Sequence, residues 1–398
     1  CCCWPALLLL LAMLAGGTVF VTKYLATTIS YVQRVEDPLK EGHVALDMRR
    51  DMWRAAEAMW HDHFWWGVGP GLYNDRFHEY RSEHVQLQPD RAHNDYLNLL
   101  ADWGTTGGLI VLAGMAVFGL GLVKTWEHVR RAEKDFGSGK SNRFAFFLGA
   151  TAGLLALAAH SAVDFNLHIP ANALLGVALL ALLTSNLRFA TDGYWFKMGL
   201  PARSVVTVVL VAGIMALGWQ EWRRGHESYW ITRAEQLPNY SAARAAALEK
   251  AFAADPHDET IAYAIGECYR TQSFDGGDDY AALAQKAMDW YARGMKLNPH
   301  DADNYLRTGM CLDWLGRSAD AEPYYNRADA LDPNGYYTAD NIGWHYIQTG
   351  DYPAARSWFQ RSVRLEGNNN PIARNYLNLI EQKLTQQTAG TGALSAGF

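Results

Sequence analysis

The chain has 398 residues, of which 49% are hydrophobic and 19% charged, and its formal net charge is −6 at pH 7. Neither half is basic enough to suggest nucleic acid as a partner, because nucleic-acid-binding domains carry a basic patch or stripe. The charges of residues 1–222 gather between long apolar runs, whereas those of residues 223–398 are spread evenly. We therefore predict a membrane domain followed by a water-soluble domain.

Five apolar runs in the first half lack Asp, Glu, Lys and Arg, and crossing a bilayer as a helix takes about 20 such residues. The first run begins Cys1-Cys2-Cys3-Trp4 without an initiator Met or a basic region, which indicates a chain entered part-way through a larger protein rather than a signal peptide. The predicted spans are about 4–22, 103–123, 144–163, 169–187 and 204–220.

Basic loops orient these spans, since Lys and Arg are enriched in cytoplasmic connections. The connections 124–143 and 188–203 are both rich in Lys and Arg, so we place them in the cytoplasm. The polar stretch 23–102, the turn Asp164–Pro170 and the chain after residue 221 then face outside.

Two patterns mark the outer stretch 23–102. Residues Leu46–Trp60 have apolar side chains at helical spacing, which predicts an amphipathic helix able to lie on the membrane interface. The following segment, Trp65-Trp66-Gly67-Val68-Gly69-Pro70-Gly71, is typical of an aromatic interface belt and a tight turn. It is not a P-loop, because no Gly-Lys-Ser/Thr follows, although its N–H groups are an alternative cradle for an anion.

A polar run, Arg91-Ala92-His93-Asn94-Asp95, stands directly before the second span. An ionisable cluster beside hydrocarbon is costly and marks a functional site. The structural alternatives are that His93 is an interfacial hydrogen-bonding residue and that Asp95 caps the helix. A second polar break, at Asp164 and His168, is expected to line a cavity on the same outer side.

Four motifs together resemble the signature of the O-antigen ligase/polymerase superfamily, over about residues 1–190. They are Arg49-x-x-x-Trp53, Gly67-Val68-Gly69-Pro70-Gly71, His93-Asn94-Asp95-Tyr96-Leu97-x-x-x-x-Asp102-x-Gly104, and His160 to Pro170. The resemblance implies a polytopic, all-α transferase of the bacterial inner membrane, normally with more spans than this chain supplies. Such enzymes move a glycan from an undecaprenyl-diphosphate carrier to a lipid, glycan or protein acceptor outside the cytoplasm, by an inverting displacement without metal or cofactor.

The resemblance assigns Arg49 to the diphosphate. A guanidinium suits this role because it stays charged and pairs bidentately with phosphate oxygens, which stabilises the departing diphosphate. The sequence alone does not rank Arg49 against Arg50, Arg54 and Arg91, which are further predicted substrate-binding residues.

The transfer also needs a base for the acceptor hydroxyl, and imidazole suits proton transfer near neutral pH. His93 is therefore the predicted catalytic base. Asn94, Asp95 and Asp102 are expected to orient it, and Asp164 and His168 to line the outer vestibule.

The second half, 223–385, contains repeats of 34 residues. One set of small and aromatic residues, Gly309, Ala321 and Tyr325, recurs 34 residues later as Gly343, Ala355 and Phe359. An earlier copy begins near Gly266 and carries an insertion around residues 274–278. This period matches the tetratricopeptide repeat and predicts an α-solenoid of stacked helix pairs.

We expect a capping helix at 371–384 and a disordered tail at 386–398. The concave face of such an array commonly holds a periplasmic protein or peptide, and a spacer without ligand is the alternative. Cys268 and Cys311 occupy equivalent repeat positions, too far apart for a disulfide, so both are predicted to be small packed residues.

Two other classes of function stay open. A non-catalytic membrane-anchored scaffold would need neither Arg49 nor His93, and a transporter of lipid-linked glycan would favour charges inside the spans. A metal site is not expected, because His61-x-His63 has no partners at zinc-like spacing. The motifs do not separate ligase, polymerase and protein glycosyltransferase, and the repeats weakly favour a protein acceptor.

Overall fold

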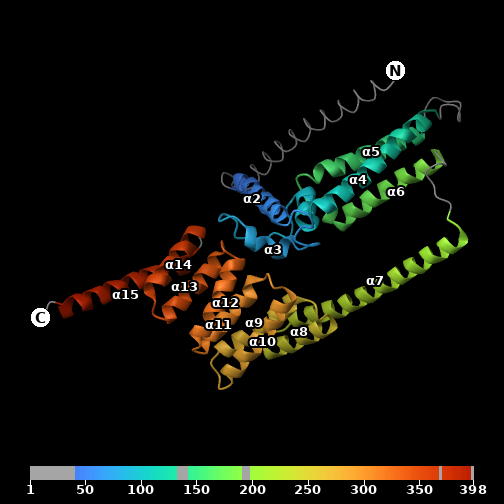
Figure 1. Ribbon diagram of the computed structural model, residues 1–398. Coiled ribbons are helices and arrows are strands. Elements are labelled where there is room, and N and C mark those ends of the chain that lie inside the picture. Colours follow the sequence, from blue (N-terminus) through green and yellow to red (C-terminus); the bar gives the residue numbers. More distant parts are fainter. Residues whose placement is uncertain (1–40, 132–141, 191–197, 367–369, 396–398) are drawn as a thin grey trace.

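The computed structural model describes residues 41–131, 142–190, 198–366 and 370–395 (Figure 1), and within these ranges all regular structure is helical. The first predicted span, 4–22, lies outside the described residues. The fold class is confirmed: an apolar helix bundle is followed by an array of helix pairs.

The bundle consists of α4 (Asp95–Arg131), α5 (Asn142–His160) and α6 (Pro170–Ala190), which pack against one another, and α7 (Leu200–Glu235) then leads to the repeats. By length and composition, α4 and α7 are able to cross a membrane, whereas α5 and α6 hold shorter apolar segments, Ala145–His160 and Pro170–Ser185. Successive helices run in opposite directions (Figure 1). The segment before α4, the connection 161–169 and the repeats therefore lie at one end of the bundle, here called the polar end.

The outer stretch folds as α2 (Glu41–Asp62) and α3 (Tyr73–Tyr80). The apolar face of α2 is buried inside the protein and packs against α3 and the start of α4, through a cluster of nine residues. The predicted helix is confirmed, but its proposed seat on the membrane interface is wrong, because this face is already covered by protein. The cluster consists of Met52, Ala55, Ala56, Met59, Tyr73, Phe77, Val85, Ala92 and Ala101.

A break in α4 fastens this outer stretch to the bundle. Gly104 has φ +63°, a left-handed conformation that favours glycine. Around it, Thr105 N donates to Phe64 O at 2.8 Å and Val68 N donates to Ala101 O at 2.8 Å. A Cβ atom on Gly104 would lie 2.5 Å from Gly67 N. The Gly67–Gly71 motif thus allows two backbones to approach closely.

The repeats are three helix pairs preceded by α8 (Ala242–Ala254), and each pair is closed by a glycine facing an aromatic ring. A Cβ at Gly309 would lie 3.0 Å from the ring of Tyr325, and Gly343 faces Phe359 in the same way. This confirms the predicted repeat pattern. The pairs are α9 (Glu259–Phe274) with α10 (Tyr280–Leu297), α11 (Ala302–Trp314) with α12 (Ser318–Leu331), and α13 (Tyr336–Gln348) with α14 (Tyr352–Leu365).

The ends and cysteines of the array complete the comparison with the sequence. Cys268 and Cys311 are free and buried, as predicted. The capping helix α15 (Pro371–Ser395) continues to Ser395, whereas the sequence predicted a disordered tail from residue 386. A short 3-10 helix, η2 (Asn166–His168), interrupts the connection between α5 and α6.

Substituting Gly104 should loosen the junction between the outer stretch and α4. We expect Gly104→Ala to lose about 1–3 kcal/mol of stability, because a side chain there meets backbone atoms and a strained φ. Gly114→Ala is the matched control, since a Cβ at Gly114 of the same helix meets no atom within 4 Å. Thermal unfolding of the detergent-solubilised protein measures the difference, and equal melting temperatures for the two variants would contradict it.

Candidate functional site

The polar end of the bundle brings together three parts of the chain that the sequence places far apart. These are the middle of α2, the segment 91–94 that enters α4, and the connection 161–169 between α5 and α6. Asp95 N donates to Ser161 O at 2.9 Å, and Tyr96 Oη donates to Ala158 O at 2.7 Å. These two bonds fix the entry of α4 against the end of α5.

His93 is held at this entry by its backbone. Its φ of +51° is left-handed, a conformation that few residues other than glycine adopt and that can mark strain at a functional site. The indole N–H of Trp53 donates to His93 O at 3.3 Å. Directly after it, Asn94 Oδ1 accepts from the N–H groups of Tyr96 and Leu97, both at 3.0 Å. Asn94 is therefore the helix cap.

The imidazole of His93 faces the connection 161–169. Its Nδ1 lies 3.4 Å from Asp164 Oδ1, and the ring sits edge-on to Phe165 with centroids 4.8 Å apart. Both side chains of the pair are 30% exposed, so the pair is within reach of solvent. Nδ1 itself is buried and makes no hydrogen bond of regular geometry, because 3.4 Å is beyond the usual N–H···O range. The contact is therefore electrostatic in character.

The arginines predicted from the sequence lie in different surroundings. Arg49 Nη1 donates to Val163 O at 3.3 Å, next to Asp164. Arg54 instead pairs with Asp51 at 3.0 Å on α2 itself and is 75% exposed. Arg50 is exposed on the same helix, and Arg91 is half-buried and interacts electrostatically with Asp102. The contact of Arg49 thus reaches the connection that holds Asp164.

A second histidine–carboxylate pair lies beside the first. His168 Nδ1 is 2.8 Å from Asp95 Oδ1, and Asp95 Oδ2 accepts from Leu167 N at 3.0 Å. Asp95 is buried and its carboxylate binds the connection 161–169, so two of its predicted roles, capping α4 and orienting His93, do not hold. The side chain of His168 is partly exposed.

Asp102 is likewise directed away from His93. Its Oδ1 accepts from Tyr73 N at 3.0 Å and its Oδ2 accepts from Asn98 Nδ2 at 2.9 Å. The expectation that Asp102 orients His93 is therefore wrong, because its carboxylate joins α3 to α4. Burial raises the pKa of Tyr73, and the charge of Asp102 acts in the same direction. The tyrosine hydroxyl is consequently a neutral donor, and it donates to Met52 O at 3.1 Å.

Tyr73 and Phe165 are the residues that sequence reasoning missed. Phe165 stood in the fourth motif beside Asp164, and Tyr73 follows directly on the glycine-rich turn. Neither aromatic carries a signal of its own in a chain with 20 Tyr and 15 Phe residues. Their position beside motif residues was the available clue.

The glycine-rich segment has little capacity left for an anion. The N–H groups of Gly67, Val68 and Gly69 donate to the carbonyl oxygens of His63, Ala101 and Asp102. These three donors are already used, so the alternative of an anion cradle fails for them. The segment is a structural turn.

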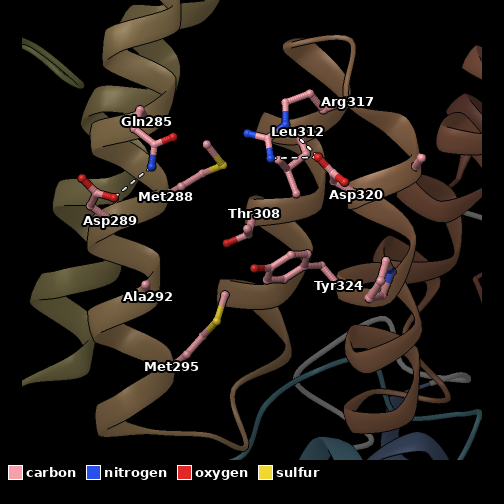
Figure 2. Close-up of a pocket in the computed structure, with 12 residues that line it drawn as sticks. Gln285, Met288, Asp289, Ala292, Met295, Thr308, Leu312, Arg317, Asp320 and Tyr324 are labelled. Atoms are coloured by element: carbon pink, nitrogen blue, oxygen red, sulfur yellow. Dashed lines mark hydrogen bonds and ion pairs between the residues drawn. The ribbon is translucent and has the colours of Figure 1, made fainter.

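The repeats carry a separate hollow of about 560 Å³ between α10, α11 and α12 (Figure 2). Met288, Met295 and Leu312 give it apolar walls, and its rim holds an ion pair of Arg317 with Asp320. No motif residue lines it. Across the described ranges, no group of three His, Cys, Asp or Glu side chains is placed to hold a metal ion.

Comparison with known proteins bears on the first part of the chain. Residues 2–112 match the model of a family described as O-Antigen ligase. The matched segment contains Arg49, the glycine-rich turn, His93 and Asp102, whereas Asp164 and His168 follow it. The match supports a glycosyltransferase-like ligase or polymerase at the level of the family.

Solved structures resemble the chain more distantly. One titled "Crystal structure of MamA" is 19% identical, covers 43% of this chain and 97% of its own, and gives a TM-score of 0.30. Another, "Crystal structure of MamA protein", is 20% identical, covers 38% of this chain and 79% of its own, and also gives a TM-score of 0.30. No curated protein matches the chain.

Proposed function

We propose that this protein transfers a glycan from an undecaprenyl-diphosphate carrier to an acceptor hydroxyl, at the polar end of its helix bundle. We place that end on the periplasmic side of a bacterial inner membrane, because the connections at the opposite end are basic. The proposal rests on one observation: Arg49, His93 and Asp164 come from three separate segments and lie near one another at the polar end of the bundle.

In this mechanism His93 is the general base. The carboxylate of Asp164 beside Nδ1 favours a proton on that nitrogen, which leaves Nε2 free to accept the proton of the acceptor hydroxyl. The hydroxyl oxygen then attacks the anomeric carbon as the bond to the diphosphate oxygen breaks. The bonding electrons leave with the diphosphate. Because the hydroxyl attacks from the face opposite to the diphosphate, the configuration at the anomeric carbon inverts.

Arg49 supplies the charge that the leaving group needs. A guanidinium beside the departing diphosphate stabilises the negative charge that develops there, most strongly where water is excluded. Its present bond goes to a neutral acceptor, Val163 O, at 3.3 Å, and a bond to a negatively charged phosphate oxygen would replace it. The apolar surface of α4 begins beside the site, with Trp103 51% and Leu109 56% exposed, and offers a path for the lipid chain.

The base assignment is tested with full-length protein in liposomes containing an undecaprenyl-diphosphate-linked glycan. We expect His93→Ala to lower transfer about 100-fold or more, because general base catalysis contributes about 10²–10⁴-fold. The transfer rate of Asp164→Asn should lie between those of the wild type and His93→Ala, since asparagine keeps the shape of the side chain but not its charge beside Nδ1. Unchanged transfer by His93→Ala would contradict the assignment. Failure of the wild type with lipid, glycan and protein acceptors alike would favour the scaffold or the transporter.

The ranking of the arginines gives an independent test. Arg49→Lys should lower transfer about tenfold or more, because lysine keeps the charge but loses the bidentate geometry. Arg54→Lys, made on the same helix, should retain transfer within about twofold, because Arg54 already pairs with Asp51 at the surface. The same donor-transfer assay measures both, and the reverse order of effects would show that Arg54 meets the diphosphate.

A further inference from the structure

The repeats contact the outer stretch through a buried ion pair. Arg81, which follows α3, binds Asp332 with two parallel bonds, Nε to Oδ1 at 2.9 Å and Nη2 to Oδ2 at 2.8 Å. The side chains are 5% and 9% exposed, and Thr338 Oγ1 also donates to Asp332 at 3.0 Å. A buried charge left without its partner is strongly unfavourable, so the two members of such a pair separate at high cost.

Further polar contacts follow the same line along the repeat loops. Asn334 Nδ2 donates to Arg81 O at 2.7 Å, and the amide of Gln86 both donates to Asn334 O at 2.9 Å and accepts from Tyr336 N at 3.3 Å. One loop earlier, His300 Nδ1 lies 2.8 Å from Glu79 Oε1. These residues line the edge of the array where its loops precede α11 and α13.

A glycine makes room for the ion pair. A Cβ atom on Gly335 would overlap the carboxylate of Asp332 and lie 2.7 Å from Arg81 Nη2. The backbone of Gly335 has φ −84°, which any residue can adopt. The absence of a side chain at this position is therefore needed for the contact and not for the turn.

From α3, the contact continues to the proposed active site. Tyr73, at the first position of α3, binds Met52 O and the carboxylate of Asp102. Met52 directly precedes Trp53, whose indole holds the carbonyl of His93. Ala92, the residue before His93, is buried in the same apolar cluster as Tyr73. Both segments that hold His93 thus pack on α3.

We propose that the Arg81–Asp332 pair is a positioning element for the transfer: the repeats hold α3, and α3 holds α2 and the segment that precedes His93. The proposal rests on the proposed function for its catalytic consequence. In this proposal, the edge of the repeats before α11 and α13 binds the outer stretch of the same chain. A periplasmic partner would therefore have to bind another face of the repeats. Arg81 and Asp332 act through α3 and do not touch the substrate.

The test adds one methyl group at the interface of the full-length protein. We expect Gly335→Ala to lower kcat for glycan transfer about 10–100-fold with KM for the lipid-linked donor within about twofold, because small misplacements of catalytic groups cost that much. Gly225→Ala is the matched control, since a Cβ there meets no atom within 4 Å. Gln86→Ala removes the bonds of Gln86 to the repeat loop and leaves the Arg81–Asp332 pair in place. It should also lower kcat, but by less than Gly335→Ala does.

Hydrogen exchange separates this proposal from the proposed function. In Gly335→Ala, amides of α3 and of residues 92–98 should exchange about tenfold faster or more, while those of α11 to α14 keep their protection. Faster exchange of α3 alone, with kcat unchanged, would overturn the proposal. If the repeats themselves lose protection in Gly335→Ala, the Gln86→Ala variant is used instead. Unchanged exchange of residues 92–98 in Gln86→Ala would then overturn the proposal. A wild type without transfer activity defeats the proposed function, and exchange at 92–98 still tests the coupling.

Discussion

The first two turns of α4 bury three polar side chains, and the arrangement of the polar end follows from satisfying them. Asp95, Asn98 and Asp102 are 5%, 1% and 3% exposed. A buried polar group without a partner costs about 1–3 kcal/mol, so each must recruit one. Asp95 accepts a hydrogen bond from the connection 161–169, Asn98 accepts one from the segment before His93, and Asp102 accepts one from the start of α3. Because each of these buried side chains needs a partner, three parts of the chain that are distant in sequence pack at the start of α4.

This constraint divides the motif residues into two groups. Asp95, Asp102 and the glycine-rich turn use their polar groups within the protein, so their part is assembly. Arg49, His93 and Asp164 are partly exposed, and the contact of 3.4 Å between His93 and Asp164 leaves room for adjustment. Residues of the same motifs thus differ in how much of their hydrogen-bonding capacity the protein itself uses.

Much of the fold followed from sequence patterns because those patterns are local. The apolar runs, the 34-residue repeat and the helix at 46–60 depend on spacing within one segment. The pairing of His93 with Asp164, and of Asp95 with His168, joins residues more than 70 positions apart, and no periodicity encodes which carboxylate meets which imidazole. The same limit explains why Arg49 could not be ranked and why α2 was assigned to the membrane interface. Its apolar face was correctly recognised, but the protein surface that covers it comes from α3 and α4.

The small size of the core in the outer stretch explains what the repeats add. Four of its nine buried residues are alanines, which bury little apolar surface. Small cores are marginal because burial must offset the conformational entropy of every ordered residue. The repeats are reached through α7, which packs chiefly against α8, so a restraint on α2 and α3 comes mainly from elsewhere. A bidentate ion pair at the far side of α3 supplies the missing restraint. Rigidity at His93 is then a property of the two halves together.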